Sequence, residues 1–156
     1  MKLLKLSITV LIFSVVGCYS PDKNNLNEKA SLNTLGDLPE NPLLLIPMTF
    51  SINPKLSTMS TLYGNKKAME SAKKNKTGSY PPGALLYEVT WKQKADSLWY
   101  GANIPDRIIR VERIQFNNDS VAEYQLYSGS PLRKIHSDFP DKEISTIISQ
   151  PVAVSP

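Results

Sequence analysis

The sequence predicts an α+β fold, a mostly antiparallel β-sheet with two short flanking helices. Residues 85–92 alternate apolar and polar side chains, as a half-buried strand does. Later extended runs are separated by short polar turns of the kind that join antiparallel neighbours. Helical spacing of apolar residues occurs only in two short stretches, near 66–75 and 144–148. The 156 residues have room for one ordinary domain.

The strand at 85–92 begins a predicted hairpin that contains both tryptophans of the chain. A polar loop at 93–97 follows, and residues 98–100 open a second extended run. A hairpin centred on Ala95 would place Trp91 opposite Trp99. Aromatic pairs of this kind contribute roughly 0.5–1.5 kcal/mol beyond the area that they bury. We therefore expect the two tryptophans to face one another in the core.

Two elements are predicted before the hairpin. The apolar run at 43–46 is interrupted by Pro47 and continues as an alternating stretch at 48–52, which restricts it to an edge strand or two short strands. Asn65 is a suitable N-cap for a helix over residues 66–75. The sequence then predicts a helix stop at Gly78 and a rigid turn at Tyr80-Pro81-Pro82-Gly83.

The elements predicted after the hairpin complete a count of five or six antiparallel strands. They are a turn at 101–106, a strand at 108–116, a turn at 117–120, a strand at 121–127 and a helix that carries Ile144, Ile147 and Ile148. Apolar residues on both faces of the strand at 108–116 indicate a bulge. The packing of this sheet alone must stabilise the domain, because the chain offers no disulfide.

The first 17 residues have the organisation of an export signal. Lys2 and Lys5 precede an apolar run at 6–16, which is too short to span a bilayer as a permanent helix. The run ends in Val15-Val16-Gly17-Cys18, which resembles the lipobox of bacterial lipoproteins. We expect a signal peptide at 1–17, lipid attachment at Cys18, and a membrane-anchored protein of the cell envelope that faces the periplasm or the exterior. A secretory signal with an incidental cysteine and an uncleaved anchor are the alternatives.

The polar, asparagine-rich residues 18–41 predict a lipidated flexible tether, with the domain at 42–156. Cys18 is the only cysteine, which excludes an intramolecular disulfide, a Cys-rich zinc site and a free cysteine nucleophile. Without Lys2 and Lys5, 16 of the 18 basic residues remain, compared with 14 acidic residues, so the net positive charge is small. This charge is too small for a nucleic-acid-binding protein.

Four segments, in this order, resemble the cytochrome P-460 family. They are STLYGN (60–65), YPPGALLYEVTWKQKAD (80–96), LWYGANIPD (98–106) and VERIQF (111–116). The resemblance extends over roughly residues 57–156 and implies a mostly antiparallel β domain with flanking helices. It also implies haem chemistry, because family members that work as cytochromes attach haem through Cys-x-x-Cys-His, and the best-known enzymes cross-link a lysine to it. This chain lacks the Cys-x-x-Cys-His motif, so thioether attachment is excluded by counting cysteines.

Few residues are candidates for a binding site. His136, the only histidine, is either an axial ligand to haem held without thioethers or a surface residue beside basic neighbours. Trp91, Trp99 and Tyr63 either line a pocket for a flat ligand or belong to the core. We expect no metal site, since one histidine and no free thiol leave only carboxylate-rich sites, and no calcium-loop motif is present.

Signatures of catalysis are absent from the sequence. It contains no G-x-S-x-G motif and no glycine-rich phosphate loop. Spacing along the chain does not pair Glu88 with Glu112 as acid and base. We therefore expect a lipid-anchored, non-catalytic binding or interaction module without a cofactor, whose partner is an unidentified small molecule or protein. The alternatives are a haem-dependent oxidoreductase that holds haem non-covalently or through a lysine, and a purely structural surface lipoprotein.

Overall fold

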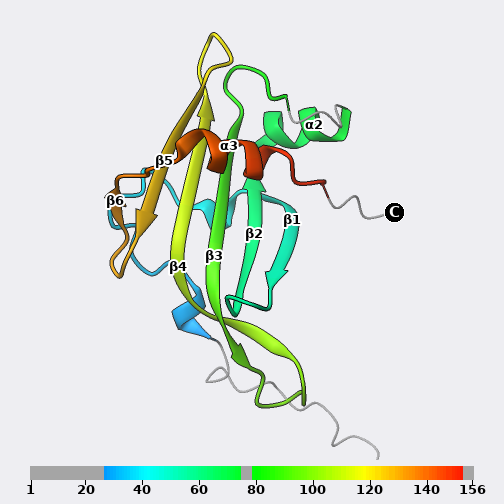
Figure 1. Ribbon diagram of the computed structural model, residues 1–156, viewed down its shortest axis with the longest axis vertical. Helices are drawn as coiled ribbons and strands as arrows, with labels where there is room; N and C mark the ends of the chain where they lie inside the picture. Colours follow the sequence, from blue (N-terminus) through cyan, green and yellow to red (C-terminus); the bar gives the residue numbers. More distant parts are fainter. Residues whose placement is uncertain (1–26, 75–78, 153–156) are drawn as a thin grey trace, which may run out of the picture.

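The computed structural model describes residues 27–74 and 79–152, and these form one six-stranded antiparallel sheet with two helices (Figure 1). The strands follow one another in chain order from edge to edge. They are β1 (Ile46–Asn53), β2 (Thr58–Gly64), β3 (Leu85–Ala95), β4 (Asn103–Phe116), β5 (Ala122–Ser128) and β6 (Arg133–Ile135). The helices are α2 (Lys66–Lys74) and α3 (Pro140–Ile148), and two 3-10 turns are η3 (Glu28–Ala30) and η4 (Pro42–Leu44). The predicted fold class is confirmed.

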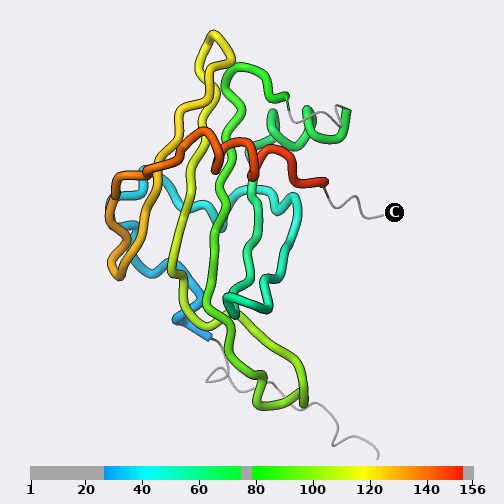
Figure 2. Tube along the Cα trace, in the orientation of Figure 1, coloured from blue at the N-terminus to red at the C-terminus, as the bar shows by residue number. Residues whose placement is uncertain are grey.

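Each face of the sheet carries its own apolar core. Helices α2 and α3 cover one face, where Ala68 and Ile147 pack against Leu86 and Ile114. The segment before β1 covers the other face, where Leu38 packs in the same cluster as Tyr87, Val89, Trp91 and Val111. Figure 2 shows this N-terminal segment crossing behind the strands, with α3 in front of them. Burial on both faces explains why β3 and β4 contain so few exposed residues in their central parts.

Two local predictions are confirmed. Strand β1 is an edge strand, and its register with β2 shifts between Pro47 and Thr49, where proline cannot donate a ladder hydrogen bond. Asn65 caps α2, because its Oδ1 accepts from the backbone N–H of Ala68 at 2.9 Å. The stop expected at Gly78 lies outside the described residues.

The predicted centre of the hairpin is wrong. Strand β3 continues to Ala95, the turn occupies 96–102, and Trp91 pairs with Ile108 instead of Trp99. Within the turn the Asp96 carboxylate accepts from the N–H of Leu98 at 2.8 Å. Gly101 adopts a φ of 81°, which favours glycine and lets the chain reverse there. The apolar run at 98–100 has no alternation, so composition alone suggested a strand.

Of the turn expected at 101–106, residues 101–102 lie in the hairpin turn, but residues 103–106 form the beginning of β4. This strand carries an extra residue opposite Thr90 and Trp91, where the register shifts from Arg110 to Ile108. The bulge predicted from the mixed faces of 108–116 is therefore confirmed.

The expectation of a flexible tether up to Asn41 fails for its described part. Trp91 Nε1 donates to the backbone oxygen of Ala30 at 2.9 Å, and Leu38 is buried. The Tyr87 hydroxyl donates to Glu40 Oε1 at 2.7 Å. A few leucines and backbone groups make these contacts, and so the polar composition of the segment concealed them.

The packed part of the protein therefore begins well before Pro42. The expected signal peptide at 1–17, the lipid attachment at Cys18 and residues 18–26 lie outside the described residues. In the described ranges we find no helix with the length and hydropathy needed to cross a bilayer.

Candidate functional site

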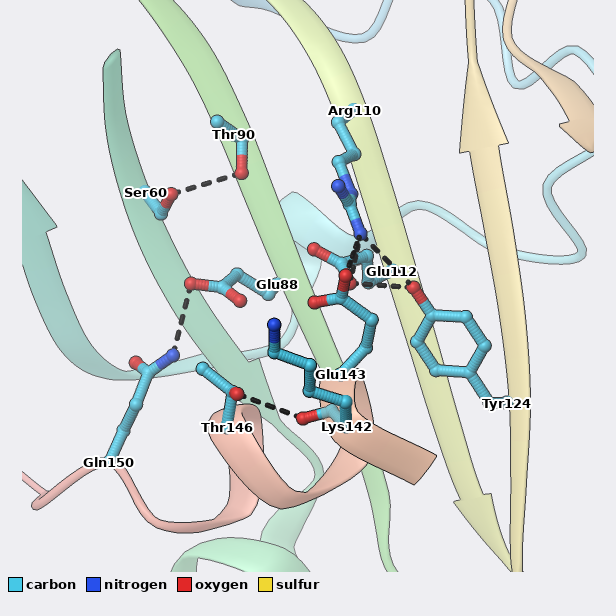
Figure 3. A network of polar contacts seen from close by, with 10 residues as sticks. All are labelled: Ser60, Glu88, Thr90, Arg110, Glu112, Tyr124, Lys142, Glu143, Thr146 and Gln150. Carbon is cyan, nitrogen blue, oxygen red and sulfur yellow. Dashed lines mark hydrogen bonds and ion pairs between the residues drawn. The ribbon is translucent and has the colours of Figure 1, made fainter. Parts of the chain in front are cut away.

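A polar cluster lies on the helix-covered face of the sheet (Figure 3). The pairing register of β3 and β4 sets Glu88 directly opposite Glu112. Glu112 is buried, and its Oε1 accepts from the Tyr124 hydroxyl at 2.6 Å and from Arg110 Nη2 at 2.9 Å. The structure thus brings together the two carboxylates that spacing along the chain could not pair.

The C-terminal helix closes this cluster. Arg110 Nη2 lies 3.3 Å from Glu143 Oε1 on α3. Just beyond that helix, Gln150 Nε2 donates to Glu88 Oε1 at 3.0 Å. Sequence reasoning missed both partners, because they are far from β3 and β4 in the chain and only the tertiary fold brings them close.

Electrostatics favour the protonated form of Glu88. Burial raises the pKa of Glu88, the Gln150 amide opposes that shift, and the nearby Glu112 charge adds to it. Burial and the bond to Glu112 likewise raise the pKa of the Tyr124 hydroxyl. The cluster can therefore hold a proton at Glu88, and its contacts through Glu143 and Gln150 connect α3 and the residues just after it to the sheet. We therefore interpret this polar cluster as a structural contact between the C-terminal segment and the sheet.

A hollow of about 450 Å³ lies on the other side, between the N-terminal segment, β4 and the β5–β6 turn. Its apolar members, Leu32, Ile108 and Leu132, are buried or half-buried. The other lining residues are Glu28, Lys29, Ser31, Asn33, Thr34, Arg107, Gly129, Ser130 and Pro131. Small-molecule sites have about this volume, 300–1,000 Å³, and combine an apolar base with a few polar groups.

The hollow was not predicted from the sequence, because the residues that form one of its walls were expected to belong to a flexible tether. Residues 28–34 form that wall, and they face Arg107 of β4 and the turn at 129–131. Arg107 lies 3.3 Å from Asp106, and its side chain is mostly exposed. A ligand can therefore reach the guanidinium from solvent.

The four residues expected to bind a ligand are not brought together. Trp91 is buried in the core, and Tyr63 packs half-buried against the same cluster. Trp99 is 71 % exposed in the hairpin turn, and His136 is exposed just after β6. Trp91 thus belongs to the core and Tyr63 lies at its edge, and a ligand-binding role for the four residues stays a prediction. None of the four lines the hollow.

Neither of two hollows in the described residues has a histidine, cysteine or methionine in its lining to ligate a haem iron. The 450 Å³ hollow has no histidine, cysteine, methionine or tyrosine among its lining residues to ligate iron. A second hollow of about 590 Å³ beside α2 contains Tyr80, Lys67 and Lys74. Burial raises the pKa of Tyr80, which opposes the tyrosinate form that ligates iron. No group of three or more metal-binding side chains occurs in the described ranges.

Comparison with known families finds a match. The model of the family described as Cytochrome P460 matches residues 46–130, which contain β1 to β5 and α2. This confirms the resemblance seen in the four sequence segments. The matched range leaves out the N-terminal segment and α3. No curated protein matches the chain at a significant level.

Proposed function

Because this chain belongs to the cytochrome P460 family, as the match over more than half of its length establishes, we propose that it is a lipid-anchored envelope protein with a non-catalytic binding domain. Membership points to a haem-related function in general. One observation supports a departure from that function. The only histidine lies exposed outside both hollows, and the only cysteine lies in the stretch that resembles a lipobox.

The 450 Å³ hollow is the proposed ligand site. Arg107 and Lys29 supply positive charge at its exposed parts, where Glu28 is the one acidic lining residue and Asp106 pairs with Arg107. Hydroxyl and amide groups of Ser31, Asn33, Thr34 and Ser130 surround the apolar base. A small amphipathic molecule with an anionic group suits this combination, because its apolar part would cover Leu32, Ile108 and Leu132 while the anion meets the guanidinium.

An anionic amphipathic dye, anilinonaphthalene sulfonate, tests this site. Arg107→Ala should weaken binding of the dye about tenfold, the loss expected for one charge-assisted contact. The matched control is Arg133→Ala, which removes an exposed arginine paired with Asp37 outside the hollow. Equal affinities for Arg107→Ala, Arg133→Ala and the wild type would reject the site.

A haem-dependent oxidoreductase is the second candidate, and family membership favours it. The absorption spectrum of the protein purified from its own host separates the two. We expect no Soret band in the purified protein, and titration with haemin should give only the spectrum of free haemin. A Soret band that is lost in His136→Ala would instead establish haem ligation and overturn the proposed non-catalytic role.

The lipid anchor is tested through Cys18. We expect the wild type in the membrane fraction with a mass increased by the lipid, since two or more acyl chains anchor a protein stably. Cys18→Ser should release the chain into the soluble envelope fraction. Retention of Cys18→Ser in the membrane at the wild-type level would contradict the anchor.

A further inference from the structure

The tip of the β3–β4 hairpin presents three consecutive large apolar residues to solvent. Leu98, Trp99 and Tyr100 are 75 %, 71 % and 107 % exposed. Single exposed apolar residues are ordinary, but a contiguous exposed group marks a contact surface. Trp and Tyr are also the side chains that gather where membranes meet water.

The tip is an ordered turn. Asp96 N–H donates to the oxygen of Ala102 at 2.9 Å, and Ala102 N–H donates to the oxygen of Trp99 at 3.0 Å. The Asp96 carboxylate accepts from Leu98 N–H. Figure 1 shows the hairpin projecting past the ends of the other strands. The three apolar side chains are thus held at an extremity of the molecule.

The N-terminal end of the described chain lies at the base of this projecting arm. Asn27 Nδ2 donates to the backbone oxygens of Pro105 and Asp106 in β4. Pro105 pairs with Gln93, so the arm beyond this point runs six residues from Gln93 to Trp99. At about 3.4 Å per residue, that arm is at most roughly 20 Å long.

The chain before Asn27 is long enough to bring a lipid to the tip. Cys18 lies nine residues before Asn27 in the sequence. Nine residues span at most about 30 Å when extended. This reach exceeds the length of the arm, so an acyl group on Cys18 and the side chain of Trp99 can enter one bilayer together.

Basic side chains surround the same end of the molecule. Lys92 Nζ donates to the oxygen of Leu56 at 3.0 Å, which ties the β1–β2 turn to the base of the arm. Exposed Lys55 lies in that turn, and exposed Lys94 lies on the arm. Asp96 alone opposes these three lysines within the two turns and the arm between them. Anionic lipid headgroups attract such lysines.

We propose that Leu98, Trp99 and Tyr100 insert into the headgroup region of the bilayer beside the lipid on Cys18. Two attachment points, the lipid and the tip, hold the arm toward the membrane and the rest of the sheet away from it. This inference rests on the proposed lipid anchor, and it adds an orientation that a lipid on a tether does not impose.

Brominated lipids test the contact, because bromine quenches only the indoles that it approaches. The lipidated full chain is placed in vesicles of phosphatidylcholine and phosphatidylglycerol brominated near the headgroup end of the acyl chains. We expect a blue shift and strong quenching in the wild type. The emission that remains should be that of buried Trp91. Trp99→Phe, a change at an exposed position, should abolish the quenchable component.

Phe139 supplies the matched control. It is 69 % exposed, almost as much as Trp99, but lies at the start of α3, away from the arm (Figure 1). The double variant Trp99→Phe, Phe139→Trp moves the exposed indole to that position and should show no quenching. Quenching equal to that of the wild type would mean that the domain lies on the bilayer without orientation, and it would overturn the proposal.

Further outcomes separate this inference from the anchor. A lipidated wild type that stays unquenched would overturn the docking of the tip and leave the anchor intact. If the wild type made in its own host carried no lipid and its Trp99 were still quenched, the anchor would be overturned and the contact of the tip with the bilayer retained. A blue shift that grows with protein concentration without vesicles would assign the tip to a second copy, against our proposal.

Discussion

Trp91 and Trp99 lie eight residues apart on one hairpin, yet the first is 5 % exposed and the second 71 % exposed. Trp91 is covered because the N-terminal segment crosses its face of the sheet and accepts its indole N–H at Ala30. Trp99 lies beyond the reach of any such cover in the described part of the chain. The contrast shows that the exposure of a tryptophan on this hairpin depends on whether another segment covers it.

The largest expected loss of stability is that of a change at Trp91, on β3 of the hairpin. Trp91→Ala should lower the free energy of unfolding by about 3–5 kcal/mol, because it empties a buried site and leaves the Ala30 oxygen without its donor. Urea denaturation measures the loss. A value below about 1 kcal/mol would show that the N-terminal segment does not bury this ring.

The N-terminal segment that covers Trp91 gives the second-largest expected loss of stability. Leu38→Ala should cost about 2–4 kcal/mol in the same measurement, since Leu38 is buried against the face that contains Trp91. Leu44→Ala is the matched control, because Leu44 is 83 % exposed and should change stability by less than about 0.5 kcal/mol. Similar losses at the two leucines would mean that residues 27–45 do not form a specific cover.

The opposite face yields a smaller effect that depends on pH. Burial raises the pKa of Glu88 in the folded protein, so its contribution is fully present below its usual pKa and is lost as the pH rises through the folded value. Glu88→Gln removes this ionisation and leaves a carbonyl to accept from Gln150. The variant should therefore melt higher than the wild type at neutral pH, and the difference should vanish in acid.

Melting curves over a pH series check this prediction. Glu123→Gln, an exposed position on β5, serves as the control and should follow the wild type throughout. If Glu88→Gln melted lower than the wild type at neutral pH, the buried carboxylate would be needed in its charged form, and the sign derived from burial would be wrong.

The smallest effect belongs to the tip. Trp99→Ala should alter the free energy of unfolding of the lipid-free protein by less than about 0.5 kcal/mol, because the ring makes few contacts with the domain. Parallel urea titrations of Trp99→Ala and Trp91→Ala give the comparison directly. A loss above about 2 kcal/mol at Trp99 would place this ring in a packed core.

Local signals in the sequence were sufficient for much of the fold. Alternation identified β3, Pro47 marked the edge strand, and Asn65 marked the start of α2. The hairpin turn was misplaced because Leu98-Trp99-Tyr100 has the composition of a strand but the hydrogen bonding of a turn. Composition therefore identified elements better than it placed their ends.

The candidate sites depended on tertiary contacts that no local signal contains. Glu88 lies opposite Glu112 because of the register between β3 and β4. Bulges on β4 adjust that register. The 450 Å³ hollow exists because polar residues 28–34 pack beside β4 and the β5–β6 turn. A segment of tether-like composition thus became a wall of the proposed ligand site.

The quenching of Trp99 in the anchored protein by brominated lipid tests most directly whether the two ends of this hairpin have separate roles. Our account predicts a quenchable component in the wild type that Trp99→Phe removes, with Trp91 emission unchanged. An anchored wild type whose Trp99 emission is the same in brominated and ordinary bilayers would contradict it.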